Sequence, residues 1–224
     1  MSRSIYEQVL GSQFENLHPR IQERFGFSSK DQLASIGQGV MDRIWFSKWA
    51  AVPLALGASR HIMFPQSGSN IPFTIENYAY KDGLGRETVT WIRKFQFKRA
   101  VRHFDATMIY SQARHRIVDY LGNKQHLAVD LDIKAASNGG ILIRSGDQRF
   151  YEGLIQFTCP PLLTGTADVL EWYDEDMKKY RICVNVTSPV FGTVFHYEGS
   201  FEAQFIPLKH VPIDAKPLRE EARE

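Results

Sequence analysis

The chain has 224 residues, 43% of them hydrophobic and 23% charged, which is the composition of a soluble globular protein with a sizeable core. Its formal net charge is only +2 and its basic residues are interspersed with acidic ones, so nothing indicates a nucleic-acid partner. The two cysteines are too few for a disulfide framework or a cysteine-based metal site. The beginning of the chain lacks the apolar core of a signal peptide, and the longest apolar stretch, residues 44–58, is too short to span a bilayer. We therefore expect a cytoplasmic protein without a transmembrane segment.

The N-terminal region is expected to be helical. Ser4 and Glu7 have the spacing of a capping box, and Pro19 and Gly26 suit the start and end of a second short helix. Residues 39–46 can form a strand, and the segment that follows them fits either a helix or a buried loop. We expect one domain over residues 1–209 that includes a helical cap at about residues 4–58, followed by a charged, solvated tail at residues 210–224.

From about residue 60 the sequence reads as a series of strands. Segments rich in β-branched and aromatic residues predict strands at 61–65, 72–80, 87–97, 102–111, 115–122, 125–135, 140–146, 149–157, 168–174, 179–188 and 195–207. Short turn sequences such as KDGLGR and SNGG separate them, which predicts antiparallel pairing. So many strands cannot remain one flat sheet, so we expect a mainly β fold: a calycin- or lipocalin-like antiparallel barrel or a strongly curled sheet, with a sandwich as the alternative.

One strand carries a charge on its apolar face. Arg93 shares the parity of Trp91 in the segment 87–97, so its guanidinium must be paired or must border a polar cavity. The preceding strand offers Glu76 and Asn77, which point to opposite faces, so at most one of them joins Arg93 inside. The face shared with Phe73 favours Asn77.

Histidines supply the candidates for acid–base chemistry. His103 and Asp105 lie on one face of a predicted strand, where the carboxylate could orient the imidazole; a solvent-facing polar strip is the alternative interpretation. Arg43 and His61 are further candidates, at a barrel mouth, although such charges more often form ion pairs that tie the helical segment to the barrel. Tyr120 is a further candidate for orienting a ligand. The histidines have no metal-ligand spacing, and no catalytic or cofactor motif is present, so we predict neither a metal nor a cofactor.

Several segments resemble one bacterial family. GVMDRIW at 39–45, the stretch 71–95, IRSGDQRFYEG at 143–153 and VFGTVFHYEGSFEA at 190–203 are similar to the family catalogued as domain of unknown function 4166. The resemblance extends from before Gly26 to about Phe205 and implies no reaction, because the family has no established catalytic residues. In some relatives the domain follows a saccharopine-dehydrogenase-like or short-chain-type oxidoreductase, which implies an oxidoreductase as a partner.

Three functions remain open. The leading hypothesis is a non-catalytic binder that holds a small apolar or lipid-like molecule in a barrel cavity. The side chains expected to orient that molecule are Arg43, His61, Glu76, Asn77, Arg93, His103, Asp105 and Tyr120. The second hypothesis is an enzyme that acts on such a ligand, with His61 or His103 as proton carrier and Asp105 beside it. The third is an interaction module for an oxidoreductase or a membrane surface, which exposure of residues 44–56 would favour.

Overall fold

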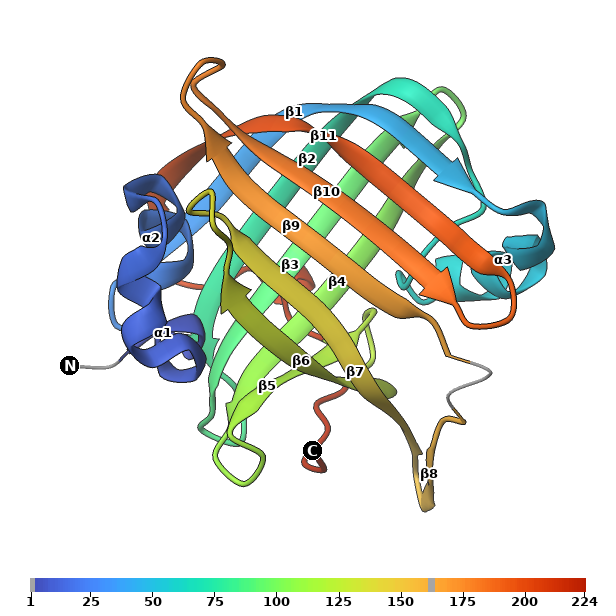
Figure 1. Ribbon diagram of the computed structural model, residues 1–224. Helices are drawn as coiled ribbons and strands as arrows, with labels where there is room; N and C mark the ends of the chain where they lie inside the picture. Colours follow the sequence, from blue (N-terminus) through green and yellow to red (C-terminus); the bar gives the residue numbers. More distant parts are fainter. Residues whose placement is uncertain (1–2, 161–163) are drawn as a thin grey trace.

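The computed structural model describes residues 3–160 and 164–224 (Figure 1). Its strands form one antiparallel sheet. They are β1 (Leu33–Phe46), β2 (Gly68–Lys81), β3 (Glu87–Phe97), β4 (Ala100–Ser111), β5 (Arg116–Leu121), β6 (Leu127–Ala135), β7 (Ile141–Glu152), β8 (Ile155–Thr158), β9 (Thr166–Asp174), β10 (Lys179–Ser188) and β11 (Gly192–Pro207).

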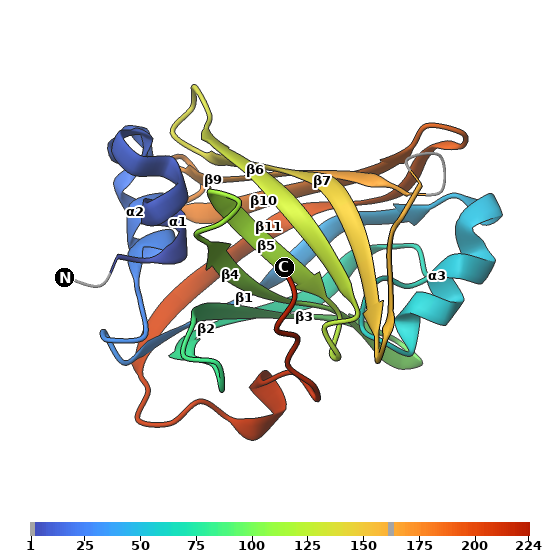
Figure 2. The ribbon, with the colours of Figure 1, turned by 90° about the horizontal axis from the view of Figure 1, so that it is seen from below.

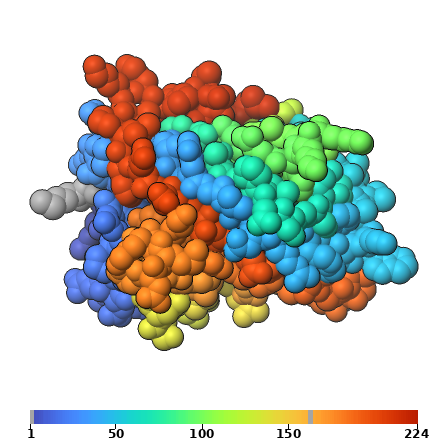
Figure 3. Space-filling view, turned by 90° about the horizontal axis from the view of Figure 1, so that it is seen from above, coloured from blue at the N-terminus to red at the C-terminus, as the bar shows by residue number. Residues whose placement is uncertain are grey.

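The sheet closes on itself. β1 pairs with both β2 and β11, and β6 pairs with β7, so every strand except β8 belongs to one closed ring. β8 is an additional short strand that pairs with β7 within the described residues. Seen from above, β11, β1 and β2 lie side by side across the outer wall (Figure 3). The mainly β, closed antiparallel barrel predicted from the sequence is confirmed, whereas the specific likeness to calycins remains a prediction.

Three of the predicted strands differ from those of the structure. Residues 61–65 form the irregular connection between α3 (Ala51–Ala58) and β2, where His61 has a left-handed backbone with φ of 59°. The segments at 140–146 and 149–157 are not two separate strands, because β7 continues through Gly146 and turns only after Glu152. A register shift in its pairing with β6, opposite Asp130, allows that continuation.

Short helical segments lie at opposite ends of the barrel. α1 (Ile5–Leu10), η1 (Gly11–Asn16) and α2 (Pro19–Gly26) cover one end, and η2 (Lys48–Ala50) with α3 lies at the other (Figures 1 and 2). The predicted capping box of Ser4 and Glu7 is present. Within the range of about 4–58 expected for the cap, the strand predicted at 39–46 is present as the second half of β1, which begins earlier, at Leu33. In the described part of the chain no helix has both the length and the apolar character needed to cross a lipid bilayer.

The C-terminal tail is packed against the barrel, so the expectation of a solvated tail is wrong. It crosses the outside of the barrel (Figure 2) and contains η4 (Ile213–Ala215). Leu218 N–H donates to the carbonyl of Asn123 (2.8 Å), and the Tyr120 hydroxyl donates to the carbonyl of Arg223 (2.8 Å). These bonds cover an outer apolar cluster around Tyr120, so the barrel wall is buried on both faces in this region.

Candidate functional site

The barrel encloses a cavity of about 120 Å³ whose wall is mostly apolar. The alternation of LAVDL in β6 directs Leu127, Val129 and Leu131 inward, and Val184 and Val186 of β10 line the cavity from another side. Ile62 and Met63, from the connection after α3, also line it. The cavity is therefore bounded by a segment that does not belong to any strand.

Arg93 places a guanidinium in this apolar wall. The residue is 4% exposed, and its Nε donates to the carbonyl of Phe104 (2.7 Å) on the neighbouring strand. Its Nη1 donates to the hydroxyl of Tyr197 at 3.3 Å. The Arg93 Cζ also lies 3.9 Å from the centre of the Phe104 ring, a cation–π distance. These contacts hold the guanidinium in a fixed direction beside the cavity.

Asp119 is the second ionisable group of the cavity wall, and the sequence-based list of candidates does not contain it. Burial raises the pKa of its carboxyl to about 7, although the positive charge of Arg93 acts to lower it. Its Oδ1 is buried and accepts no hydrogen bond within the described residues. The alternation of side chains along β5 could have identified Asp119. It lies opposite Met108 in the pairing of β4 with β5, and this register places the Asp119 carboxyl on the inward face.

A buried ion pair lies towards the α2 end. Arg24 Nε contacts Glu171 Oε1, and Arg24 Nη1 donates to the hydroxyl of Ser35 (2.9 Å). Both charged side chains are almost completely buried, at 1% and 0% exposed. Burial raises the pKa of Glu171, while the neighbouring Arg24 acts to lower it. Neither Arg24 nor Glu171 lines the cavity, and we assign the pair to the attachment of α2.

His61, His103 and Asp105 come together on the outside of the barrel. His61 Nδ1 lies 2.6 Å from Asp105 Oδ2, and His103 Nδ1 lies 3.4 Å from the same oxygen. The two imidazole rings are stacked, with centres 4.3 Å apart. Burial acts to raise the pKa of Asp105, but the neighbouring imidazoles of His103 and His61 outweigh it and lower that pKa. Asp105 is thus an ionised carboxylate between two imidazoles.

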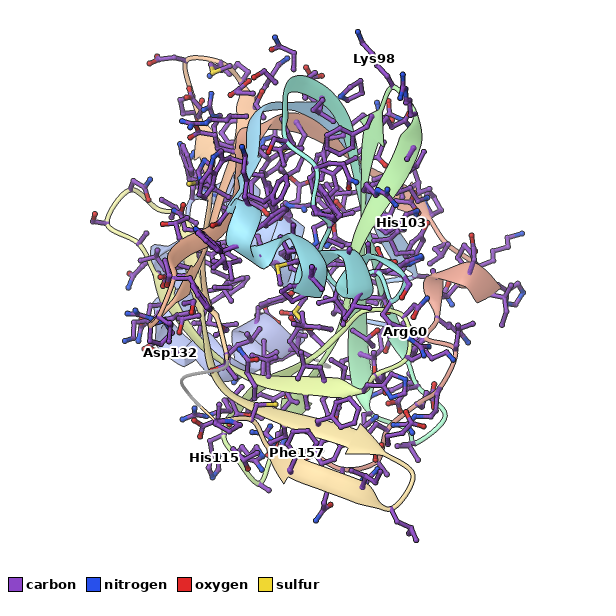
Figure 4. All side chains as sticks on the ribbon, turned by 90° about the vertical axis from the view of Figure 1, so that its right-hand side faces the viewer. Arg60, Lys98, His103, His115, Asp132 and Phe157 are labelled. Carbon is purple, nitrogen blue, oxygen red and sulfur yellow. The ribbon has the colours of Figure 1, made fainter. Side chains whose placement is uncertain are left out.

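This histidine cluster is separate from the cavity. Asp105 opposes Ile92 across the β3–β4 pairing, and Ile92 packs in the outer cluster with Tyr78 and Tyr80. None of the three cluster residues lines the cavity. Figure 4, which faces α3, shows His103 to one side of that helix, near Arg60. The hypothesis of acid–base chemistry on a ligand in this cavity is therefore not supported by the positions of His61 and His103.

The remaining candidates divide between the two faces of the wall. Asn77 is 3% exposed and shares the inward face of Phe73 and Ile75, and its Oδ1 accepts no hydrogen bond among the described residues. Glu76 points outward, where it binds Lys94 Nζ (2.6 Å). The inward position favoured for Asn77 is thus the one observed, although Asn77 does not line the cavity.

Arg43 and Tyr120 also lie away from the cavity. Arg43 is exposed on the outside of β1, after a register shift next to Asp42. Tyr120 is fully buried, but under the C-terminal tail on the outer face. The expectation that Arg43 and Tyr120 orient a ligand in the barrel is therefore not supported by their positions.

Comparison with known proteins decides the family. A model of the family described as domain of unknown function 4166 (DUF4166) matches residues 17–201. The chain belongs to this family. The "Uncharacterized protein YndH" of Bacillus subtilis (strain 168) is 33% identical to this chain over 202 residues, which are 90% of this chain and 97% of that protein. No solved structure matches.

The DUF4166 match contains both features described above. All residues that line the cavity, from Ile62 to Val186, lie inside residues 17–201, and so do His61, His103 and Asp105. Helix α1 and the C-terminal tail lie outside the matched range. The family assignment therefore applies to the barrel and both candidate sites.

Proposed function

We propose that this DUF4166 protein binds a small, mostly apolar molecule in the barrel cavity, with the polar end of that molecule at Arg93 and Asp119. The observation that carries the proposal is the pairing of a mostly apolar wall inside the barrel with two ionisable side chains in it. A pocket of this kind, apolar with a few convergent polar groups and a perturbed pKa, is the usual form of a small-molecule site. The proposal thus assigns the binder hypothesis from the sequence a cavity and two polar side chains, Arg93 and Asp119.

The volume of the cavity sets the size of the ligand. A cavity of about 150 Å³ in another protein accommodates benzene, and the cavity here has about 120 Å³. The cavity is therefore of the size class that suits a ligand no larger than a single aromatic ring or a short aliphatic chain. A longer lipid-like chain would have to displace wall residues such as Met63 or Met108, whose unbranched side chains adapt readily.

The two polar groups set the chemistry of the ligand's polar end. Arg93 can only donate hydrogen bonds, whereas Asp119, with a pKa of about 7, can donate when protonated and accept when ionised. The buried Asp119 Oδ1 lacks a protein partner in the described residues. A hydroxyl or carboxyl group satisfies both side chains, because each can accept from Arg93 and share a proton with Asp119.

Binding can be tested by filling the cavity. We expect native mass spectrometry of the purified protein to detect a bound small molecule, and an apolar fluorescent probe to bind the delipidated protein. Ala167→Phe places a ring in the cavity and should abolish probe binding, whereas Leu142→Phe, on the outward face of β7, should leave it unchanged. Equal probe binding by the two variants, both folded, would show that the cavity is not the binding site.

A second function, docking on a membrane surface, is favoured by exposed apolar residues at the α3 end. We call these residues the α3 patch: Trp49, Val52 and Leu56, which are 84%, 72% and 71% exposed, with Val190 and Phe191, which are 56% and 61% exposed. The β10–β11 turn that carries the last two lies at the same end of the barrel as α3 (Figures 1 and 2). Ser47 N–H donates to the carbonyl of Val194 (2.9 Å) and joins the two segments.

The charges around the α3 patch match an anionic lipid surface. Lys48 and Arg60 lie close in sequence to the two ends of α3 and are exposed, and the segment between them contains no aspartate or glutamate. Arg43 is exposed as well, but it lies opposite Glu198 across β1 and β11. An apolar surface accompanied by exposed cations is the chemistry that binds anionic membranes. Because Ile62 and Met63 follow α3 and line the cavity, a ligand could pass between a lipid surface and the barrel at this end.

Vesicle co-sedimentation tests the second function. The protein should bind phosphatidylglycerol-containing vesicles more strongly than phosphatidylcholine vesicles. The double variant Trp49→Ser and Leu56→Ser should weaken binding by about tenfold or more, since each inserted apolar side chain contributes over about 1 kcal/mol. Leu142→Ser, which also changes an exposed leucine, is the control. A cytoplasmic location and an oxidoreductase partner remain predictions from the sequence and its family resemblance.

A further inference from the structure

The cluster of His61, His103 and Asp105 has the donor set of a transition-metal site. One nitrogen of each imidazole and one carboxylate oxygen all lie within 4.8 Å of one another. Two nitrogens and one oxygen suit Zn²⁺, Fe²⁺, Co²⁺ or Ni²⁺, whereas Mg²⁺ and Ca²⁺ prefer ligands that are all oxygen. We propose that these three side chains bind one divalent transition-metal ion on the outer face of the barrel.

The backbone fixes the three side chains relative to one another. Asp105 N–H donates to the carbonyl of His61 (2.8 Å), and Gly122 N–H donates to the carbonyl of Asp105 (2.8 Å). Asn123 N–H donates to the carbonyl of Arg60 (3.0 Å). The carbonyls of both Arg60 and His61 are therefore hydrogen-bonded to the barrel. His61 itself has the left-handed φ of 59°. Ligands held on hydrogen-bonded backbone in this way pay little conformational entropy when a metal binds.

Two atoms of the cluster lack sufficient protein partners. Asp105 Oδ1 is buried and accepts no hydrogen bond in the described part of the chain. His103 Nδ1 is also buried and lies 3.4 Å from Asp105 Oδ2, an oxygen that His61 Nδ1 already contacts at 2.6 Å. A cation between these groups would satisfy both of them. Buried polar atoms rarely lack a hydrogen-bond partner, so these two atoms indicate a site for a further bonding partner.

The exposure of the cluster leaves room for further ligands on the metal. The side chains of His61, His103 and Asp105 are 35%, 25% and 13% exposed. Three protein ligands with an open position are the arrangement of a metal that also holds water or a small anion. The carboxylate supplies one negative charge, so the bound divalent ion would retain a net positive charge.

Metal binding predicts a small rearrangement. Four-coordinate Zn²⁺ with bonds of about 2.0–2.1 Å places neighbouring ligand atoms about 3.3 Å apart. The separation of 2.6 Å between His61 Nδ1 and Asp105 Oδ2 must therefore widen, and the metal replaces the proton between them. The two rings, now stacked at an angle of 23°, must also turn towards a common point.

Titration of the chelator-treated protein with Co²⁺ tests the proposal directly. We expect a visible absorption band that saturates at one equivalent, and a rise in melting temperature when Zn²⁺ is added, because the metal binds the folded state. His61→Asn, His103→Gln and Asp105→Asn should each weaken Co²⁺ binding by more than about tenfold. Asparagine tolerates the left-handed backbone at position 61, which keeps that variant foldable.

His126→Gln is the matched control. His126 also has a carboxylate partner, with Nδ1 2.6 Å from Glu152 Oε2, but no second histidine is part of that pair in the described residues. This variant should bind Co²⁺ like the wild-type protein. The absence of a saturable Co²⁺ band in the wild-type protein would overturn the proposal, and so would a band that persists in folded His103→Gln and Asp105→Asn.

Discussion

Arg93 and Phe104 oppose each other across β3 and β4, and the pair satisfies one guanidinium in two ways. The Phe104 carbonyl accepts the hydrogen bond from Arg93 Nε, while the Phe104 ring lies 3.9 Å from Cζ. A planar guanidinium can stack on the ring while its edge donates to the carbonyl, a geometry that the compact ammonium of lysine does not reproduce. The position therefore requires arginine and not only a positive charge.

Replacing Arg93 by lysine tests this requirement. Arg93→Lys keeps the charge but loses the hydrogen-bonding geometry, so we expect the free energy of unfolding to fall by about 2 kcal/mol in urea titrations. Arg116→Lys, at the exposed start of β5, should change it by less than about 0.5 kcal/mol. Equal stability of the two variants would show that the planar contacts at Arg93 do not matter.

Asp119 should make stability depend on pH. Its pKa is raised from 3.8 to about 7 in the folded protein, so between these values the native state binds more protons than the unfolded state. Stability must then fall as pH rises from about 4 through 7, by an amount on the order of 4 kcal/mol if the whole shift is realised. Asp119→Asn cannot ionise and should flatten this part of the profile of unfolding free energy against pH.

The control for that profile is Asp132→Asn. Asp132 lies on the outward face of β6, where its side chain is 57% exposed, so this variant should retain the wild-type pH dependence. A profile for Asp119→Asn that still falls between pH 5 and 8 as steeply as the wild-type profile would contradict the assignment of the raised pKa.

The buried ion pair of Arg24 and Glu171 predicts a large cost for removing one partner. Glu171→Gln leaves the Arg24 guanidinium buried without a counter-charge, which should lower the free energy of unfolding by about 3–5 kcal/mol. The double variant Arg24→Met and Glu171→Leu buries no charge and should recover most of the loss. Glu175→Gln, at an exposed carboxylate bonded to His18, should cost under about 1 kcal/mol. A double variant less stable than Glu171→Gln would contradict this account.

Gly122 permits the close approach of the segment that carries His61. A Cβ at this position would lie 2.3 Å from the carbonyl oxygen of Arg60, and φ is +80°. Gly85 has nearly the same φ, +79°, but nothing within 4 Å of its Cβ position, so Gly85→Ala isolates the backbone strain. We expect Gly85→Ala to cost about 1 kcal/mol and Gly122→Ala clearly more, with changed chemical shifts for His61 and His103. Equal costs would show that the contact with Arg60 is easily relieved.

The strand periodicity was sufficient to predict the barrel and the face of several residues. The inward positions of Arg93 and Asn77 follow from parity within adjacent strands, a local property that neighbouring residues determine. Asp119 could have been found in the same way, because its register with Met108 is set by the short turn between β4 and β5. Its importance was not visible because nothing in the segment RIVDYL shows that a cavity lies beside it.

The parts that sequence reasoning missed depend on contacts between distant residues. Arg24 and Glu171 are 147 positions apart, and His61 and Asp105 are 44 apart, so no local pattern connects them. The tail was misjudged for a different reason. Its charges are satisfied within the packed structure, as when Arg219 and Arg223 bind the buried Glu221 carboxylate, so its polar composition did not imply solvation.

The closure of the ring has a consequence for folding. Most pairs of neighbouring strands in the barrel are joined by short connections, and such hairpins can form early and independently. The pairing of β1 with β11 instead brings together the beginning and end of the barrel sequence, from Leu33 with Pro207 to Phe46 with Phe195. Loop-closure entropy opposes that contact most strongly, so it should form last. The amides of β1 and β11 should accordingly gain protection from hydrogen exchange later in refolding than those of β3 and β4.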